Sequence, residues 1–343
     1  MKRCVVPILK FAVPVAIVVY LVFRMDRQQP GQFTRLWEQS KNWPLLVTGF
    51  CLVMTAVALT FVRWWLLVRA LDLPFRLTEA LRLGFLGYLF NFVGIGAVGG
   101  DLLKAVYIAR RQPGRRTQAV ATVVLDRVIG MYVLLIVATA AILASDVSRL
   151  GAAVQALREV MLLTGTVGTV TMVLALTLPI REGPWHTRLG RIPYAGPMFL
   201  RLVSALQAYR RRLGCLAAVF GLSLLTQVLF PMAFYLIGAS LFQRPPTPAQ
   251  HFMIVPLSMC TGVIPTPGGM GTFEFAMDEL YRRVAPDSDA QGLIVALAYR
   301  AMTIGVATIG IVYYWTGRRE VRSLLEQTEA EQRHTAPSTC YGP

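Results

Sequence analysis

The stretch Thr261-Gly-Val-Ile-Pro265-Thr-Pro267-Gly268-Gly269-Met-Gly271-Thr-Phe-Glu274 lies within apolar sequence, yet its composition is incompatible with regular helix. Its two prolines remove backbone donors and fix two φ angles, and Gly268, Gly269 and Gly271 add three positions with little helix preference. Irregular backbone persists inside a bilayer only where protein or a water-filled cavity satisfies it. An irregular segment that ends in a carboxylate is therefore a candidate functional site.

The same stretch could instead be a solvent loop between two transmembrane helices. The apolar segment before it, residues 252–261, is too short to cross a bilayer alone. Apolar segments of about 10–14 residues more often form re-entrant or core helices. We therefore favour a re-entrant helical hairpin over residues 249–284.

The composition indicates an all-α polytopic membrane protein. Of its 343 residues 55% are hydrophobic and 15% are charged, and the mean hydropathy is +0.54. The formal net charge of +16 would suit nucleic acid, but the basic residues flank apolar segments. This placement indicates control of membrane topology and contact with anionic lipid headgroups. The five cysteines and three histidines show no ligand spacing, so we expect no metal and no cofactor.

Hydropathy predicts six full spans, at about 4–23, 44–62, 118–143, 160–180, 213–242 and 291–315. We interpret Arg63-Trp64-Trp65, just after the second span, as an interfacial anchor. Residues 1–317 are expected to form one transmembrane domain. Residues 318–343 are polar and are predicted to form a disordered cytoplasmic tail.

Basic residues orient the chain. They concentrate in segments 104–116 and 181–212 and in the tail, whereas segment 243–250 contains only Arg244. The positive-inside rule places the three basic segments and both termini in the cytoplasm. Region 77–110 then begins and ends inside, and region 249–284 begins and ends outside. Each region must enter the membrane and return, as a re-entrant hairpin or a pair of short helices.

The two halves of the chain align at one constant offset, the offset that places Asp101 on Glu274. Asp101 and Arg127 are separated along the chain by the same distance as Glu274 and Arg300. This offset aligns the second span with the fifth and the third with the sixth. It also aligns two further pairs: Gly96 with Gly269, and Arg110 with Arg283.

This alignment predicts an inverted repeat, with repeat 1 at about 1–145 and repeat 2 at about 155–317. Each half contains three full spans, which is an odd number, and one hairpin, so the two halves cross the membrane in opposite directions. Such repeats are typical of transporters, whose site lies at the repeat interface near the midplane.

The glycines near Asp101 match a nucleotide-binding pattern only superficially. Gly94-x-Gly96-x-x-Gly99 fits the dinucleotide fingerprint, but that fingerprint requires a preceding strand and a βαβ unit. A hairpin tip is the better interpretation, with glycines that allow close packing and leave N–H groups free for an anion such as a lipid phosphate. Asp287-Ser-Asp289 is interpreted as a helix-cap turn rather than a metal–nucleotide site.

Arg127 and Arg300 lie deep inside the third and sixth predicted spans. Arginine at that depth is costly unless it is paired or faces a cavity. One interpretation is an ion pair that stabilises the bundle, with Asp126 or Asp101 as the partner of Arg127. The other is that both arginines bind a phosphate bidentately during transit. The two interpretations are compatible.

Four motifs of the chain are distinctive: Phe90-Asn91, Val98-Gly99-Gly100-Asp101-Leu-Leu-Lys104, Leu125-Asp126-Arg127 and Pro265-x-Pro267-Gly268-Gly269-x-Gly271-x-x-Glu274. With them the chain resembles the lysylphosphatidylglycerol synthase transmembrane-domain family, the flippase-like domain, over residues 5–320 or so. The resemblance implies a polytopic helical domain that moves lipids or lipid-linked groups between leaflets. In the full-length synthases an aminoacyltransferase domain follows. Here only the short polar tail follows the last span, so we do not expect lysyl transfer.

The expected function is therefore that of a lipid flippase in the plasma membrane of a bacterium or archaeon. It would move an anionic phospholipid or a lipid-linked phosphate by alternating access, without nucleic acid and without catalytic residues. Two alternatives stay open: a membrane enzyme acting on polyprenyl-phosphate-linked glycan or lipid, and an accessory subunit. The residues predicted to bind the headgroup are Asp101, Arg127, Glu274, Arg300, Gly99, Gly100, Gly268, Gly269 and Gly271. Those assigned a structural role are Asn91, Pro265, Pro267 and Asp126.

Overall fold

The computed structural model describes residues 40–93, 99–112, 114–144, 152–177, 212–263, 271–288 and 291–316, together with single positions at 19, 20, 22, 23, 27, 206, 207, 209 and 210. This part of the chain is helical and contains no strand, as the composition predicts. Most of the first predicted span, both glycine-rich tips at 94–98 and 264–270, and the predicted tail lie outside the described residues.

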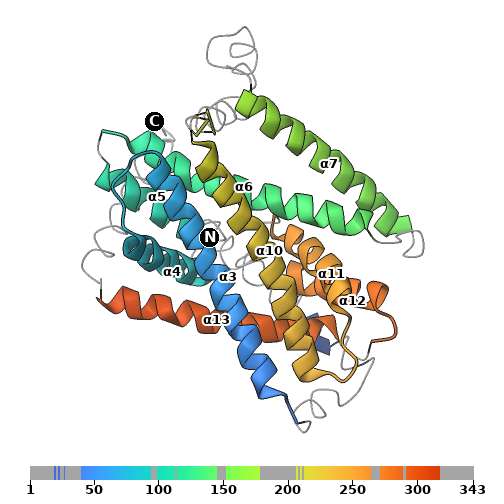
Figure 1. Ribbon diagram of the computed structural model, residues 1–343. Coiled ribbons are helices and arrows are strands. Elements are labelled where there is room, and N and C mark those ends of the chain that lie inside the picture. Colours follow the sequence, from blue (N-terminus) through green and yellow to red (C-terminus); the bar gives the residue numbers. More distant parts are fainter. Residues whose placement is uncertain are drawn as a thin grey trace, which may run out of the picture.

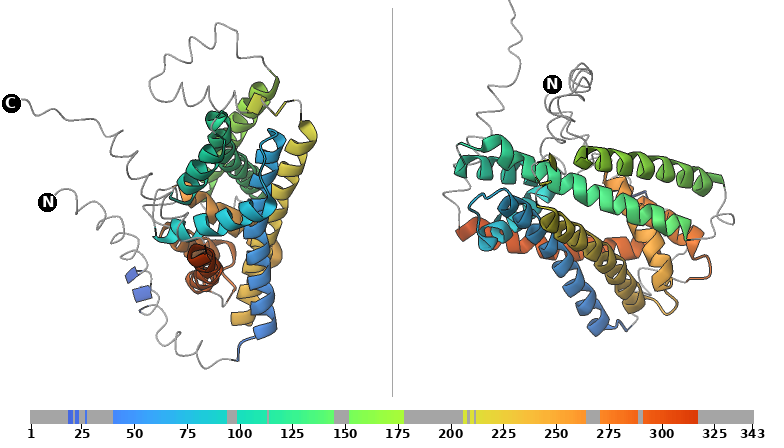
Figure 2. Two further views of the ribbon diagram at one scale, coloured as in Figure 1. Left: turned by 90° about the vertical axis from the view of Figure 1, so that its left-hand side faces the viewer. Right: turned by 45° about the horizontal axis from the view of Figure 1, so that its top comes forward.

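Within the described residues, four helices are long and apolar enough to cross a membrane: α3 (Trp43–Ala70), α6 (Arg116–Leu143), α10 (Leu213–Leu241) and α13 (Gly292–Thr316). They coincide with four of the six predicted spans. Helix α7 (Ala152–Thr177) covers most of the predicted fourth span and is not among these four. It lies along α6, where the Tyr132 hydroxyl donates to Thr169 Oγ1 at 3.0 Å (Figure 2).

Each broken region consists of two short helices that pack against each other. The first contains α4 (Leu77–Val93) and α5 (Gly99–Arg111), and the second contains α11 (Pro248–Cys260) and α12 (Thr272–Val284), with a 3-10 turn, η3 (Thr261–Val263), after α11. Helices α5 and α12 have 13 residues each. At a rise of 1.5 Å per residue they are about 20 Å long, too short for a hydrocarbon core of about 30 Å.

Local sequence explains where α11 begins. Thr247 accepts a hydrogen bond from the Gln250 N–H, and the Gln250 side chain accepts one from the Thr247 N–H. This reciprocal capping box satisfies two backbone donors at the start of the helix. Pro248 occupies the first helical position, where its missing N–H costs nothing.

Helices α3 and α10 lie side by side and run in opposite directions (Figure 1). At one end the Asn42 N–H donates to the Ser240 carbonyl at 3.2 Å. At the other end the Tyr209 hydroxyl donates to the Leu67 carbonyl at 2.8 Å. Among the other helices, α4 packs against α13 and α11 packs against α6.

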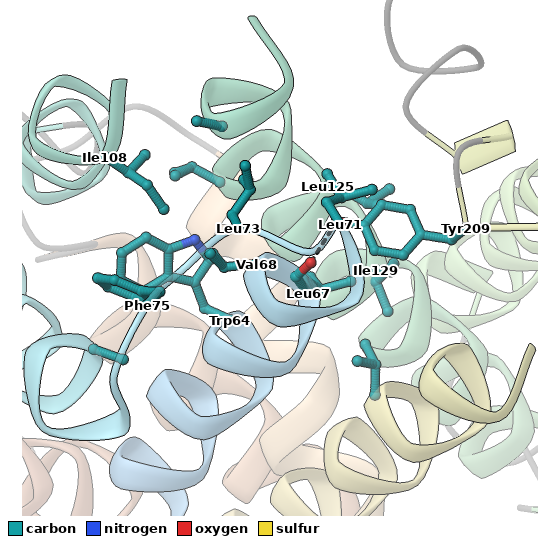
Figure 3. Packing of buried hydrophobic residues seen from close by; sticks show 14 of the residues in the cluster. Trp64, Leu67, Val68, Leu71, Leu73, Phe75, Ile108, Leu125, Ile129 and Tyr209 are labelled. Carbon is teal, nitrogen blue, oxygen red and sulfur yellow. Dashed lines mark hydrogen bonds between the residues drawn. The ribbon is translucent and has the colours of Figure 1, made fainter. Parts of the chain in front are cut away.

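The largest apolar cluster surrounds the end of α3 (Figure 3). There the Trp64 ring meets the Phe75 ring edge-on, with 5.1 Å between centroids. The interpretation of Arg63-Trp64-Trp65 as an interfacial anchor is therefore wrong for its first two residues. Helix α3 continues to Ala70, and Arg63 and Trp64 are buried, at 7% and 0% exposed. Neighbouring helices cover the face of α3 that carries Arg63 and Trp64, and the Asp126 carboxylate pairs with Arg63.

Candidate functional site

The first predicted pair forms a bidentate ion pair. Asp101 lies in the first turn of α5, and Arg127 lies in the interior of α6. Arg127 Nη2 donates to Asp101 Oδ1 at 3.0 Å, and Arg127 Nε donates to Asp101 Oδ2. The Asp101 side chain is 16% exposed, whereas that of Arg127 is 50% exposed. Of the two acids considered as partners of Arg127, the structure selects Asp101.

The second pair joins the equivalent helices, with both arginine donors on one carboxylate oxygen, and is more deeply buried. Glu274 lies in the first turn of α12, and its Oε1 accepts hydrogen bonds from Arg300 Nε at 3.0 Å and Nη2 at 2.7 Å. Its Oε2 accepts from the Gly271 N–H at 2.6 Å. The exposed fractions of the two side chains are 1% for Glu274 and 14% for Arg300. Gly271 has a φ of 85°, a left-handed conformation that favours glycine.

Gly100 holds α4 and α5 close together. A Cβ atom on Gly100 would lie 2.0 Å from the Gly87 carbonyl oxygen, so a larger residue would separate the helices. The Gly100 N–H donates to Asn91 Oδ1 at 3.0 Å. Gly100 therefore packs closely against α4, and its N–H is bonded. Close packing with free N–H groups was expected of Gly94, Gly96 and Gly99, and the first two of these lie outside the described residues. Gly99 is the first residue of α5 and is half-buried.

Asp126 takes part in a separate buried network that the sequence did not reveal. Arg63 Nε donates to Asp126 Oδ1 at 2.7 Å, and Nη2 donates to the Asp126 carbonyl at 3.2 Å. Arg63 Nη1 donates to Ser223 Oγ at 3.0 Å. These contacts join α3, α6 and α10. Because adjacent residues of an α-helix point about 100° apart, Asp126 and Arg127 serve different partners.

Lys104 is a second basic residue, besides Arg63, whose buried contacts were not predicted, although it belongs to the motif that contains Asp101. It is 8% exposed, and its Nζ lies 3.8 Å from Asp101 Oδ1. The same nitrogen lies 5.4 Å from the centroids of both the Phe61 and Trp64 rings, within cation–π range. Its place one helical turn after Asp101 was the available signal, since residues so spaced are neighbours on a helix.

Pro265, Pro267, Gly268 and Gly269 lie outside the described residues. In the part of the chain that is described, no group of three or more histidine, cysteine, aspartate or glutamate side chains could hold a metal ion.

These features define the class as a helical integral membrane protein with paired charges inside its bundle. Residues 8–310 match the family described as "Lysylphosphatidylglycerol synthase TM region". The chain belongs to this family, as its motifs predicted, and the family indicates a membrane protein of lipid modification or translocation. No curated protein matches the chain. No solved structure matches it either.

Proposed function

We propose that the protein is a lipid translocase that moves a phospholipid or a lipid-linked headgroup between leaflets by alternating access. The observation that carries this proposal is the occurrence of two carboxylate–arginine pairs at equivalent places. Each pair joins the first turn of a short helix to the interior of a long apolar helix. Charges inside a membrane protein mark substrate paths by default, and arginine matches the geometry of phosphate.

The packing of the helices supports an inverted repeat. Helices α5 and α12 have the same length, and the repeat offset carries both ends of α5 onto those of α12. The contact of α4 with α13 has a counterpart in that of α11 with α6, and the contact of α3 with α4 has one in that of α10 with α11. Exchanging the two halves therefore reproduces these contacts, and the antiparallel helices α3 and α10 lie side by side (Figure 1).

The depth of Arg127 suits a site near the midplane. It lies about 16 Å along α6 from the start of that helix, roughly half the thickness of a hydrocarbon core. Its half-exposed guanidinium can exchange the Asp101 carboxylate for a phosphate, because both accept two parallel hydrogen bonds. Movement of one half against the other would then carry the headgroup across.

Reconstitution tests the proposal. The purified protein is placed in phosphatidylglycerol liposomes with a trace of headgroup-labelled phosphatidylglycerol, and exchange between leaflets is measured. We expect exchange above that of protein-free liposomes, a slower rate for Arg127→Met, and the wild-type rate for Arg282→Met, which changes the Asp278–Arg282 pair within α12. Exchange at the protein-free rate would reject translocation of this lipid class and favour the enzyme or accessory role.

A further inference from the structure

The two ion pairs differ in the exposure of the arginine and in the number of cations near the carboxylate, and both differences bear on transport. In the first pair the arginine is half-exposed, and a second cation, Lys104, already lies 3.8 Å from the carboxylate. In the second pair both side chains are buried. The residue equivalent to Lys104 at the repeat offset is Met277, which is apolar and fully buried.

We propose that Lys104 is a spare counter-ion that neutralises Asp101 when Arg127 leaves to bind the phosphate of the substrate. In this proposal only the Asp101–Arg127 pair opens during transport, and the Glu274–Arg300 pair stays closed. The proposal rests on the proposed function, because it assigns the phosphate-binding step to one half of the molecule.

The surroundings of Lys104 hold its ammonium group beside Asp101 whether or not Arg127 is present. Its Nζ lies against two aromatic rings of α3, and its Cε lies 3.3 Å from where a Gly87 Cβ would be. Removing one partner of a buried pair is strongly destabilising, because it leaves an uncompensated charge. With Lys104 in place, the departure of Arg127 leaves Asp101 with a cation.

The second half lacks the same arrangement. The position equivalent to Asp126 is Tyr299, whose ring packs on Phe234 with 4.5 Å between centroids and on Phe273 with 5.9 Å. Met277 supplies no charge to Glu274. If Arg300 left, the Gly271 N–H would still donate to a carboxylate that is 1% exposed, but its cation would be gone. The free energy needed to separate Glu274 from Arg300 would therefore be far larger than that needed to separate Asp101 from Arg127.

The charges of the first half also indicate the kind of anion that fits. Arg63, Lys104 and Arg127 are opposed by Asp101 and Asp126, which leaves one positive charge in excess among these five residues. A phosphodiester carries a single negative charge and would balance it. Phosphatidylglycerol is a suitable probe, since its phosphodiester is its only charged group.

The test compares Lys104→Met, which copies the second half, with the double variant Lys104→Met/Asp101→Asn. Both are measured in the phosphatidylglycerol liposomes, with thermal unfolding in detergent as a folding control. We expect the single variant to exchange lipid about tenfold more slowly, because the departure of Arg127 would then leave the Asp101 carboxylate without a cation, which raises the free energy of the open state. The double variant should recover most of the rate, because no unpaired carboxylate remains when Arg127 leaves.

Two controls separate this role from packing. Lys41→Met, near the start of α3, should exchange at the wild-type rate. Lys104→Met/Asp278→Asn should stay slow, because it removes an acid that pairs with Arg282 on α12 instead of Asp101. If Lys104→Met does not fold, Lys104→Gln is used with the same expectations.

A wild-type rate in the single variant, or no recovery in the double variant, would overturn the counter-ion role while translocation itself stands. Absence of exchange by the wild-type protein would overturn the proposed function instead.

Discussion

At the scale of single residues, charge placement is the main feature of this protein. The carboxylates of Asp101 and Glu274 each sit in the first turn of a short helix, where the positive end of the helix dipole also favours them. Each is nevertheless tied to an arginine on another helix. The pairs thus connect the short helices to the long ones.

We predict that double-mutant cycles will show coupling within both pairs. For Asp101→Asn with Arg127→Met we expect about 1 kcal/mol, because Lys104 lies beside Asp101 as a second cation and offsets part of the loss. For Glu274→Gln with Arg300→Met we expect about 2–3 kcal/mol, because both groups are buried. Unfolding in detergent measures both values.

A surface pair between the ends of α3 and α10 provides the control for these cycles. The side chains of Asp72 and Arg212 are 69% and 49% exposed, so their coupling should be about 0.5 kcal/mol or less. Additive effects at Asp101 and Arg127 would show that those two residues do not share a site.

A second residue-scale prediction concerns Gly100. Gly100→Ala should destabilise the protein by about 1–3 kcal/mol, because the new methyl group would collide with the Gly87 carbonyl and push α4 from α5. Gly221→Ala on α10 is the matched control, since its Cβ would meet nothing within 4 Å. The control should be neutral or stabilising by up to about 1 kcal/mol, given the better helix preference of alanine. Equal melting temperatures for the two variants would contradict the steric argument.

At the scale of helices, the buried network around Arg63 connects α3, α6 and α10. We predict that Arg63→Met destabilises the protein by about 3–5 kcal/mol, because Asp126 is then buried without its cation. Adding Asp126→Asn should recover much of this loss, since no lone charge remains. Thermal unfolding measures the stability of both variants. A double variant as unstable as the single one would show that lost packing, and not the unpaired charge of Asp126, causes the loss of stability.

The helices and the site were predictable to different degrees, for physical reasons. Hydropathy places the long helices, because a membrane core demands long apolar segments. The equal acid-to-arginine spacing placed the two acids and the two arginines at equivalent positions, but it left the partner of Arg127 open and did not pair Glu274 with Arg300. Arg63 and Ser223 are far apart along the chain, so only the packing of α3 on α10 brings them together. Its position beside two tryptophans made Arg63 resemble an interfacial residue. Lys104 was equally inconspicuous, because its aromatic neighbours lie on another helix.

At the scale of the whole molecule, the proposed orientation can be tested by labelling. In a background without native cysteines, Gln112→Cys should react with a membrane-impermeant thiol reagent only from the cytoplasmic side, and Thr247→Cys only from outside. The reason is that Gln112 lies between the basic end of α5 and the basic start of α6. Thr247 instead caps α11, shortly after the end of α10. Labelling of both positions from the same side would rule out the inverted repeat.

The buried contact between Arg63 and Asp126 has a consequence for the timing of transport. Asp126 immediately precedes Arg127, so the backbone that carries the phosphate-binding arginine is anchored to two other helices. Arg127 can then release Asp101 by side-chain rotation, which takes picoseconds to nanoseconds, whereas rearrangement of packed helices takes microseconds to milliseconds. Loading would be a rapid equilibrium that precedes the slow step. Arg127→Lys should accordingly raise the lipid fraction needed for half-maximal exchange, measured by varying the phosphatidylglycerol content of the liposomes, and leave the maximal rate nearly unchanged.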